Sequence, residues 1–394
     1  MRFLCLHHGD IFSEQLWSGI PLNIMKTLKA QGHEVVAVGN LRPGATLRGR
    51  IKGQLYKRLF RKLYLINRDP LTAAARARDA NRRIRAAGKV DAIIATQLAD
   101  AAFIEVEAPI ITVHDATWIQ LLDYYPGYER SGYAPETIAG GIALDKMGLE
   151  RAAHCIFASE WAARSAHKDY GIPRSKLSVA SLGANLPRIP SREEHQSCLE
   201  RRGTGACKFL FLGLEWQRKG GRTAVAILDE LKRRGLPVEL HVVGCTPEGE
   251  MPAFVRSHGR LWKNDPRQAE ELVNLFENGD FFLLPTRAEC FGLVFCEAAA
   301  YGLPVITADT GGVAEVVSAD WAIAKPLPIP IAEYADWIME HYRDREKYAR
   351  ASLAAREAFE QRLNWNVLCH HIAQVAGRLQ GDPASHQASQ QPRA

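Results

Sequence analysis

The stretch DFFLLPTRAECFGLVFCEAAAYGLPVITADTGG, from Asp280 to Gly312, alternates two kinds of segment. Its apolar runs at 280–286 and 304–308 are short and bounded by turn residues, as buried strands are. The segment between them, which begins near Leu293, has the composition of a helix. A strand, a helix and a second strand in this order predict parallel strands joined by a crossover helix.

The same alternation of short apolar runs and amphipathic stretches extends over most of the chain. Strands are predicted at Phe3–His7, Val35–Val38, Ala92–Thr96, Ile110–His114, Cys155–Ser159 and Leu177–Ala180, and a second series begins with 208–214 and 238–244. Between the two series, 186–208 is polar and carries two prolines, which is typical of a linker.

The sequence therefore predicts an α/β protein with two doubly wound domains in tandem. The first spans 1–188 and the second 205–360. A C-terminal helix is expected at 361–380, packed back on the first domain. The polar residues 381–394 are expected to form a disordered tail.

Composition excludes several classes of protein. Of the 394 residues, 47% are hydrophobic and 24% charged, as in globular proteins. The net charge of +6 is too small to predict a nucleic-acid partner. No apolar run is long enough to cross a bilayer. The 8 cysteines form no C-x-x-C pair, which favours reduced thiols in a cytoplasmic protein.

The segment 42–68 is basic, without an acidic residue among its cations, and apolar residues interleave with them. Its cations include Arg48, Arg50, Lys52, Lys57, Arg58, Arg61 and Lys62. One interpretation is a solvated helix face. The other is an amphipathic helix that contacts anionic lipid at the inner face of the membrane, or a basic wall for a phosphate-bearing acceptor.

Ligands of open α/β sheets bind beyond the carboxyl ends of the strands. After the predicted strand 208–214, Arg218 and Lys219 stand beside Gly220, which opens a helix. Cations next to a helix N-terminus predict an anion site, although a basic surface turn remains an alternative. The spacing is not that of a P-loop, and no G-x-G-x-x-G follows any strand.

Two glutamates flank the next such helix start. Glu289 lies in the loop after strand 280–286, and Glu297 lies inside the helix that follows Gly292. The N–H groups near Leu293 and Val294 can hold phosphate. Carboxylates accept hydrogen bonds from hydroxyl groups, so the pair suits the ribose and the sugar of a nucleoside diphosphate sugar.

The motifs LPTRAECFGLVFCEAAAYGLPVITADTGGVAEVV, FLFLGLEWQRKGG and SGIPLNIMKTLKAQGHEVV together resemble the retaining glycosyltransferases of family 4. HDATW and ASEWAARSAHKDYGIPRSKLSVASLGAN resemble the first-domain side of those enzymes, so the resemblance covers most of residues 1–320. It implies the GT-B architecture, in which two Rossmann-like domains face each other across a cleft. The first motif resembles the Glu-x7-Glu donor signature of the family.

On the donor side, the resemblance assigns roles to the second domain. Glu289 would hold the hydroxyl groups of the donor sugar, aided by backbone N–H groups at Phe291–Gly292. Glu297 would take the ribose hydroxyl groups. Lys219, with Arg218, would neutralise the diphosphate leaving group, and which of the two carries that duty stays open.

On the first-domain side, the resemblance places His114 near the reacting sugar. The family's first loop corresponds to HHGDIFSEQLWSGIP, where Gly9 and Gly19 are candidate points of close approach and Ser18 a candidate hydrogen-bond donor.

The chain departs from the family at two places. Leu214 follows Gly213, where many members have arginine, and the first loop lacks their double glycine. No Asp-x-Asp pair occurs in the sequence, so transfer without a metal or cofactor is expected.

The resemblance implies transfer from a UDP- or GDP-linked sugar to a glycan or lipid-linked acceptor, with retention of anomeric configuration. Two alternatives use the same architecture: a nucleotide-sugar 2-epimerase and an inactive nucleotide-sugar-binding module. The missing glycine fingerprint argues against an NAD-dependent dehydrogenase.

Overall fold

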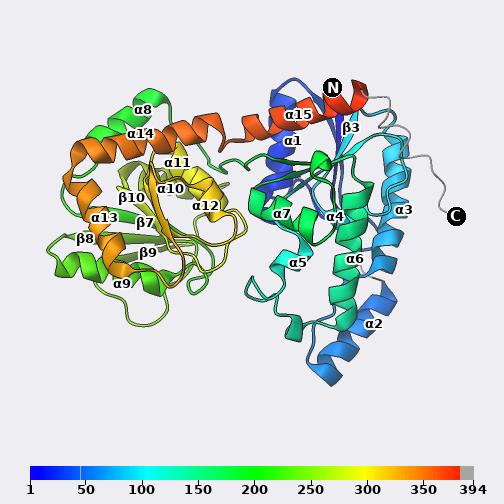
Figure 1. Ribbon diagram of the computed structural model, residues 1–394, viewed down its shortest axis with the longest axis horizontal. Helices are drawn as coiled ribbons and strands as arrows, with labels where there is room; N and C mark the ends of the chain where they lie inside the picture. The colour runs from blue at the N-terminus through cyan, green and yellow to red at the C-terminus, as the bar shows by residue number, and fades with distance from the viewer. Residues whose placement is uncertain (45, 382–394) are drawn as a thin grey trace. The chain divides into compact units, whose positions relative to one another are not determined.

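The computed structural model describes residues 1–44 and 46–381, which form two compact units (Figure 1). Unit 1 comprises 1–181 and the helical segment that begins at Trp365, and unit 2 comprises Leu182–Asn364. Each unit is built on its own parallel sheet of 6 strands, so the predicted fold class of two Rossmann-like α/β domains is confirmed. Of the predicted tail 381–394, all but the first residue lies outside the described residues.

The sheet of unit 1 has the strand order β2-β1-β3-β4-β5-β6. Its strands are β1 (Arg2–Leu6), β2 (Glu34–Val38), β3 (Ala92–Ala95), β4 (Ile110–His114), β5 (His154–Phe157) and β6 (Leu177–Val179). In the parallel register, Leu4 of β1 lies opposite Val36 of β2 and Ile93 of β3. The sequence located all six strands to within about two residues at each end.

Burial explains why these strands were predictable. Every residue of β3 and β4 is buried, because helices cover both faces of the sheet, and the strands are accordingly continuous apolar runs. The outer strands β2 and β6 are only partly buried. Apart from the helices at 47–55 and 365–381, the helices of unit 1 are α1 (Ile20–Ala30), α3 (Pro70–Ala86), α4 (Leu98–Ala101), α5 (Trp118–Leu121), α6 (Pro135–Arg151) and α7 (Glu160–Lys168).

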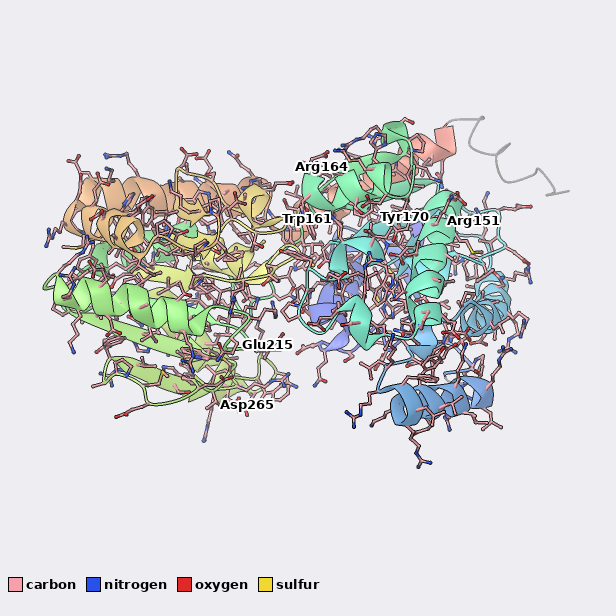
Figure 2. All side chains as sticks on the ribbon, turned by 60° about the horizontal axis from the view of Figure 1, so that its bottom comes forward. Arg151, Trp161, Arg164, Tyr170, Glu215 and Asp265 are labelled. Atoms are coloured by element: carbon pink, nitrogen blue, oxygen red, sulfur yellow. The ribbon has the colours of Figure 1, made fainter. Side chains whose placement is uncertain are left out.

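Polar side chains fasten the loops of unit 1 to its helices. Arg151, at the end of α6, donates hydrogen bonds of 2.8 Å to the carbonyl oxygens of Ile104 and Val106 (Figure 2). The hydroxyl of Tyr170 accepts a 3.2 Å bond from the N–H of Ile119. These bonds satisfy backbone groups of a loop and of the first turn of α5 that would otherwise be unpaired.

The C-terminal helix α15 (Trp365–Gly381) belongs to unit 1, where it packs against α1. Leu368, Cys369 and Ile372 are fully buried in this contact. The thiol of Cys369 lies 3.6 Å from the carbonyl oxygen of Ile24, and Gln31 donates a 3.0 Å bond to the carbonyl oxygen of Asn366. The chain therefore returns to unit 1 after it has completed unit 2.

The basic segment 42–68 forms α2 (Leu47–Leu55), a π-helical turn (Tyr56–Phe60) and a short 3₁₀ turn at its end. Lys52 and Tyr56 bond to Glu136 of α6 at 2.9 and 2.5 Å and so attach the segment to unit 1. Figure 1 shows α2 at the end of unit 1 away from its sheet. Within the described residues, no helix combines the length and the apolar character that crossing a membrane requires.

The sheet of unit 2 has the order β12-β11-β10-β7-β8-β9. Its strands are β7 (Cys207–Leu212), β8 (Val238–Val243), β9 (Val255–Gly259), β10 (Phe281–Leu284), β11 (Val305–Ala308) and β12 (Ala322–Lys325). Its helices are α8 (Arg192–Arg201), α9 (Gly221–Arg233), α10 (Pro266–Asn278), α11 (Leu293–Ala300), α12 (Val313–Val316), α13 (Ile331–Arg343) and α14 (Arg345–Gln361). Because β7 and β10 are neighbours, the loops that follow them leave the sheet side by side.

The structure differs from the sequence prediction in the segment 186–208. This segment is not an irregular linker, because it contains α8 within unit 2. Ser191 and Glu194 form a capping box at the start of α8, and His195 bonds to Ser352 at 3.0 Å. The sequence also missed the outer strands β9 and β12. All 8 cysteines are buried and unpaired with one another.

Candidate active site

In unit 2, hydrogen bonds join the two loops that carry the predicted donor residues. The N–H of Arg287, after β10, donates a 2.8 Å bond to the carbonyl oxygen of Arg218, after β7. The guanidinium of Arg218 in turn donates a 3.0 Å bond to the carbonyl oxygen of Ala288. Both loops therefore act as one framework at the carboxyl edge of the sheet, where α/β sheets bind ligands.

Glycine allows this close approach. Gly220 precedes α9 with a φ of +78°, and a Cβ atom there would lie 2.0 Å from the carbonyl oxygen of Pro285. Gly244, which follows β8, has a φ of +99°, and its Cβ would lie 2.6 Å from the carbonyl oxygen of Gly213. A side chain at either position would force the loops apart.

The framework brings Lys219, Arg218 and Glu289 together. The ammonium of Lys219 forms an ion pair with the carboxylate of Glu289, and the guanidinium of Arg218 lies 3.5 Å from the same oxygen. All three side chains are buried. The predicted cations and the first predicted glutamate thus form one cluster.

The two cations of this cluster have different surroundings. Arg218 also bonds to Glu215 at 2.8 and 2.9 Å, in addition to Ala288 (Figure 2 labels Glu215). Among the described residues, Glu289 is the one side chain that pairs with Lys219. An ammonium has three N–H donors, so Lys219 retains donors for an anion, whereas Arg218 is committed largely to holding the loops.

Glu297 lies in α11 and is only 2% exposed. Its Oε1 accepts a 2.7 Å bond from the ammonium of Lys263. Its Oε2 is buried and has no hydrogen-bond partner among the described residues. Lys263, which also donates to the carbonyl oxygen of Asn185, was not predicted as a site residue. It lies just before Asp265, the N-cap of α10 (Figure 2).

The start of α11 separates the two glutamates. Gly292 is its N-cap residue in the left-handed region, and a Cβ there would lie 2.6 Å from the ring of Phe295 and 3.2 Å from Cγ of Glu289. No side chain of the described residues caps this helix end. The N–H groups of Leu293 and Val294 belong to its first turn, so the helix dipole adds partial positive charge beside Glu289. Phe291, directly before Gly292, is buried.

In unit 1, His114 ends β4 and is buried. Its Nε2 has no hydrogen-bond partner among the described residues. The ring lies 6.2 Å, centroid to centroid, from both Trp17 and Phe157. Burial, aided by the positive charge of Arg68, lowers the pKa of His114 to about 3, so its imidazole is neutral at physiological pH.

The loop between β1 and α1 holds the remaining predicted residues of unit 1. The N–H of Gly9 donates a 2.8 Å bond to Nδ1 of His7. Trp17, Ser18 and Gly19 follow one another with φ values of 44°, 54° and 75°. Two consecutive non-glycine residues in the left-handed region store strain, a feature that concentrates at functional sites.

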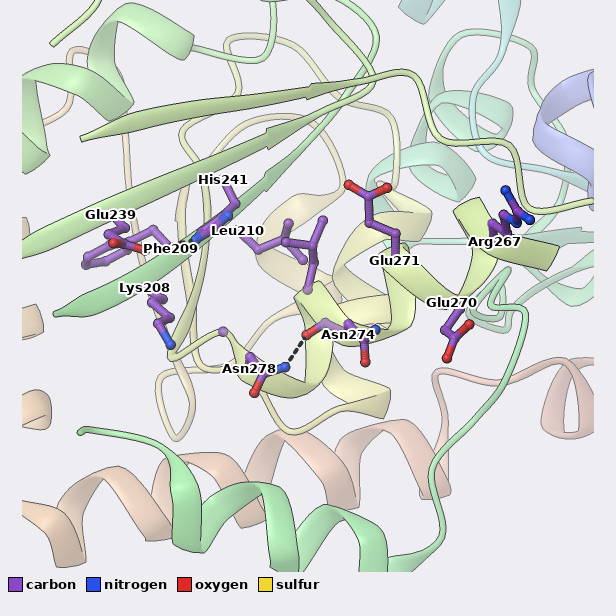
Figure 3. A pocket seen from close by; sticks show the side chains of 12 residues that line it. Lys208, Phe209, Leu210, Glu239, His241, Arg267, Glu270, Glu271, Asn274 and Asn278 are labelled. Carbon is purple, nitrogen blue, oxygen red and sulfur yellow. Dashed lines mark hydrogen bonds and ion pairs between the residues drawn. The ribbon is translucent and has the colours of Figure 1, made fainter. Parts of the chain in front are cut away.

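A separate cavity of about 440 Å³ lies on the sheet of unit 2 against α10 (Figure 3). Lys208 and Glu239, the second residues of β7 and β8, line it together with Asn274 and Asn278 of α10. These positions are at the amino ends of the strands. The cavity is therefore at the opposite edge of the sheet from Lys219 and Glu289, and it contains none of the predicted site residues.

Comparison with known proteins identifies both halves of the chain. The model of glycosyl transferases group 1 matches residues 206–341, and the model of Glycosyltransferase Family 4 matches residues 22–188. Each of the two glycosyltransferase models thus matches one part of the chain. The framework of Lys219 and Glu289 lies in the group 1 domain, and His114 lies in the family 4 domain.

Similar proteins agree with this identification. Glycogen synthase of Mycobacterium tuberculosis is 29% identical over 52% of this chain and 49% of its own length, so the chain spans about half of such curated relatives. Sucrose-phosphate synthase of Thermosynechococcus elongatus has a TM-score of 0.66 at 16% identity, over 96% of this chain and 99% of that one. The Anabaena protein HepE, solved with UDP-glucose, has a TM-score of 0.61 at 16% identity over 96% and 100%. The fold is GT-B.

Proposed function

We propose that the protein transfers a sugar from a nucleoside diphosphate sugar to a glycan or lipid-linked acceptor, with retention of anomeric configuration and without a metal ion. The observation that carries the proposal is the buried group of Lys219, Arg218 and Glu289 at the carboxyl edge of unit 2. A structural neighbour solved with UDP-glucose supports a UDP-linked donor, and a GDP-linked donor stays the alternative.

Each polar group of the candidate site in unit 2 binds a different part of the donor in this proposal. Lys219 binds the diphosphate together with the N–H groups of Leu293 and Val294. Glu289 binds hydroxyl groups of the sugar. Oε2 of Glu297, which has no partner among the described residues, accepts a hydrogen bond from a ribose hydroxyl, since a buried oxygen is costly to leave unpaired.

Arg218 has a different task in this proposal. Its bonds to Ala288 and Glu215 hold the loop after β10 in place, so it positions Glu289. Lys219 is then the group that neutralises the leaving diphosphate. Cleavage of the bond between the anomeric carbon and the diphosphate transfers negative charge to the phosphate, and a preorganised cation stabilises that charge by about 3 kcal/mol.

In unit 1, we assign His114 to the sugar and the loop with Gly9, Ser18 and Gly19 to the phosphates and the acceptor. The buried Nε2 of His114, for which the described part of the chain offers no hydrogen-bond partner, supports a ligand contact there. The neutral imidazole can donate or accept one hydrogen bond at this atom without a charge to bury. Residues 1–188 would thus serve the acceptor side and 205–360 the donor.

The experiment that tests this function follows cleavage of UDP-glucose, GDP-mannose and ADP-glucose in the presence of excess EDTA. Release of nucleoside diphosphate from one of them, with the product anomer identified by NMR, is the expected result. Conversion of the sugar to an epimeric sugar nucleotide without release would instead assign the chain to the epimerases. Release that requires added magnesium would contradict a metal-independent mechanism.

We also propose that α2 and its π-helical extension lie on anionic lipid. Leu47, Ile51, Leu55 and Leu59 are spaced four residues apart and are 74%, 62%, 51% and 65% exposed. Residues at this spacing share one helix face. Arg48, Arg50, Lys57, Arg58 and Arg61 surround this face and are exposed. An apolar face bordered by cations is typical of interfacial helices.

Charge reversal tests this contact. The variant Arg58→Glu/Arg61→Glu/Lys62→Glu is expected to lose most of its binding to phosphatidylglycerol vesicles, because each cation near an anionic surface contributes about 1 kcal/mol. Vesicle co-sedimentation measures the binding. The control is Lys26→Glu/Arg164→Glu/Lys168→Glu, which makes the same change in net charge on α1 and α7. If both variants lost vesicle binding equally, the binding would depend on net charge alone, which would contradict a docking face on α2.

A further inference from the structure

The proposed function gives no role to Lys263, although its ammonium contacts the carboxylate assigned to the ribose. Lys263 lies after β9 in unit 2 and donates a 2.7 Å hydrogen bond to Oε1 of Glu297 in α11. It also donates to the carbonyl oxygen of Asn185, which belongs to the same unit. These two acceptors fix the position of the ammonium. An ammonium has three N–H donors, so one donor remains for a ligand.

The two members of this ion pair differ in exposure. The side chain of Glu297 is 3% exposed, whereas that of Lys263 is 33% exposed. A buried carboxylate without a partner cation is costly, so Lys263 is the group that permits a charge at this position of α11. Because a third of the Lys263 side chain stays exposed, a ligand can approach the pair from this side.

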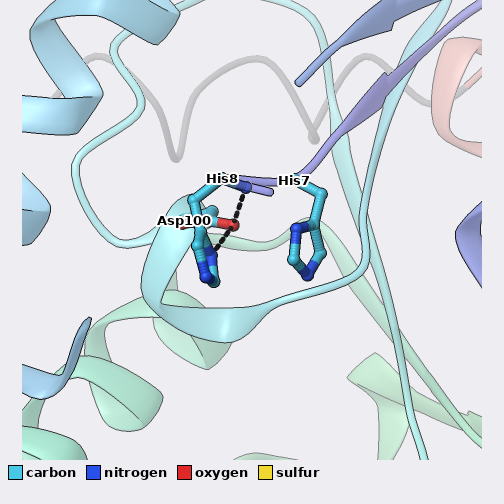
Figure 4. Close-up of side chains that lie close together, drawn as sticks. All are labelled: His7, His8 and Asp100. Carbon is cyan, nitrogen blue, oxygen red and sulfur yellow. Dashed lines mark hydrogen bonds and ion pairs between the residues drawn. The ribbon is translucent and has the colours of Figure 1, made fainter. Parts of the chain in front are cut away.

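Other buried carboxylates of the chain show what is unusual about Glu297. In unit 1, Oδ2 of Asp100 accepts the backbone N–H of His8 at 2.7 Å and lies 2.9 Å from Nδ1 of the same residue (Figure 4). In unit 2, the two oxygens of Asp280 accept backbone N–H groups at 2.7 and 2.8 Å. Among the described residues, Oε2 of Glu297 is the only carboxylate oxygen that is buried without a hydrogen-bond partner. One acceptor and one donor of this ion pair therefore remain for a ligand.

This combination suits two neighbouring hydroxyl groups. A hydroxyl group both donates and accepts, so one member of a vicinal diol can donate to Oε2 of Glu297 while the other accepts from the ammonium of Lys263. Hydroxyl groups are neutral and leave the charges of the pair balanced, whereas a phosphate beside Glu297 would meet a like charge. The 2′- and 3′-hydroxyl groups of a ribose form such a diol, and a deoxyribose does not.

We propose that Lys263 makes the donor site selective for ribose. It holds the carboxylate of Glu297 toward the diol and donates its remaining N–H to one of the two hydroxyl groups. This inference rests on the proposed function, in which Glu297 binds the ribose. It adds the residue that distinguishes a ribonucleotide from a deoxyribonucleotide.

The test compares UDP with 2′,3′-dideoxy-UDP, which lacks both hydroxyl groups, by calorimetric titration in excess EDTA. The wild type is expected to bind the dideoxy nucleotide about 100-fold more weakly, as two lost charge-assisted hydrogen bonds require. Lys263→Met should weaken UDP binding by about 10-fold and leave binding of the dideoxy nucleotide nearly unchanged, since the lost N–H has no partner in that ligand. The ratio of the two dissociation constants therefore falls in this variant.

Two variants serve as controls. Lys208→Met removes a lysine near the amino end of β7, so it should keep the wild-type ratio. Lys263→Arg keeps a cation with N–H donors beside Glu297, so its ratio should exceed that of Lys263→Met. A residue that only supported the fold would change the affinity for both nucleotides equally, so the ratio separates a ligand contact from a structural role.

The outcomes separate this proposal from the proposed function. An unchanged ratio in Lys263→Met, or equal weakening of both nucleotides, would overturn the role of Lys263 and leave the proposed function intact. The wild type alone decides the matter if Lys263→Met does not fold, because a wild-type ratio below about 3-fold would also overturn that role. Failure of the wild type to bind UDP or GDP would instead overturn the proposed function. If only GDP binds, the guanosine pair of nucleotides takes the place of the uridine pair.

Discussion

Replacement of Gly220 by alanine is expected to destabilise unit 2 by about 3–5 kcal/mol, the size of effect that a backbone clash produces. The residue has a φ of +78°, and its new Cβ would lie 2.0 Å from the carbonyl oxygen of Pro285. The loop after β10 would have to move away from the loop after β7. Because Glu289 and Lys219 sit on these loops, donor cleavage should be lost even where the variant stays folded.

Gly235 provides a matched control at the other end of α9. It has a φ of +86°, but a Cβ there has nothing within 4 Å. Gly235→Ala should therefore lower the free energy of unfolding only by the strain of a left-handed backbone at alanine, about 1–2 kcal/mol. Urea unfolding followed by circular dichroism measures both values. Equal destabilisation of the two variants would mean that the loops do not pack as described.

The second large effect is expected on catalysis. Lys219→Met should lower kcat for donor cleavage by about 10²- to 10³-fold, because the leaving diphosphate loses a preorganised cation. The fold should survive, since Arg218 remains 3.5 Å from the carboxylate of Glu289. Release of UDP from UDP-glucose measures the effect.

Lys208→Met is the control for this variant, since Lys208 lies near the amino end of β7, whereas Lys219 lies in the loop after its carboxyl end. It should leave kcat unchanged. A normal kcat in Lys219→Met, or an equal loss in both variants, would remove Lys219 from the reaction. A larger loss in Arg218→Lys than in Lys219→Met would assign the diphosphate to Arg218.

The positions of the proposed donor residues could be predicted because they follow a local rule. Glu289 and Lys219 lie in the loops after the central strands β10 and β7. These strands are mostly apolar, so the sequence marks both the strand and its carboxyl end. Lys263 escaped prediction for the converse reason. It follows β9, an outer strand whose sequence VRSHG is half polar and gives no strand signal.

Two other features were not predicted from the sequence, for different physical reasons. The helix α8 has few apolar residues, and two prolines precede it, but Ser191 and Glu194 carry the capping-box spacing that marks a helix start. The hydrogen bond between the side chains of His8 and Asp100 in unit 1 has no local signal in the sequence. The two residues are 92 positions apart, and only the pairing of β1 with β3 brings them together.

The most direct test of the donor site is calorimetric titration of UDP into the protein in excess EDTA, for the wild type, Lys219→Met, Glu297→Gln and Lys208→Met. UDP is expected to bind the wild type and Lys208→Met equally without a divalent cation. Each of the other two variants should bind at least about 10-fold more weakly, the equivalent of one lost charge-assisted hydrogen bond. Binding that appears only with magnesium, or equal affinity in all four proteins, would contradict the proposed donor site.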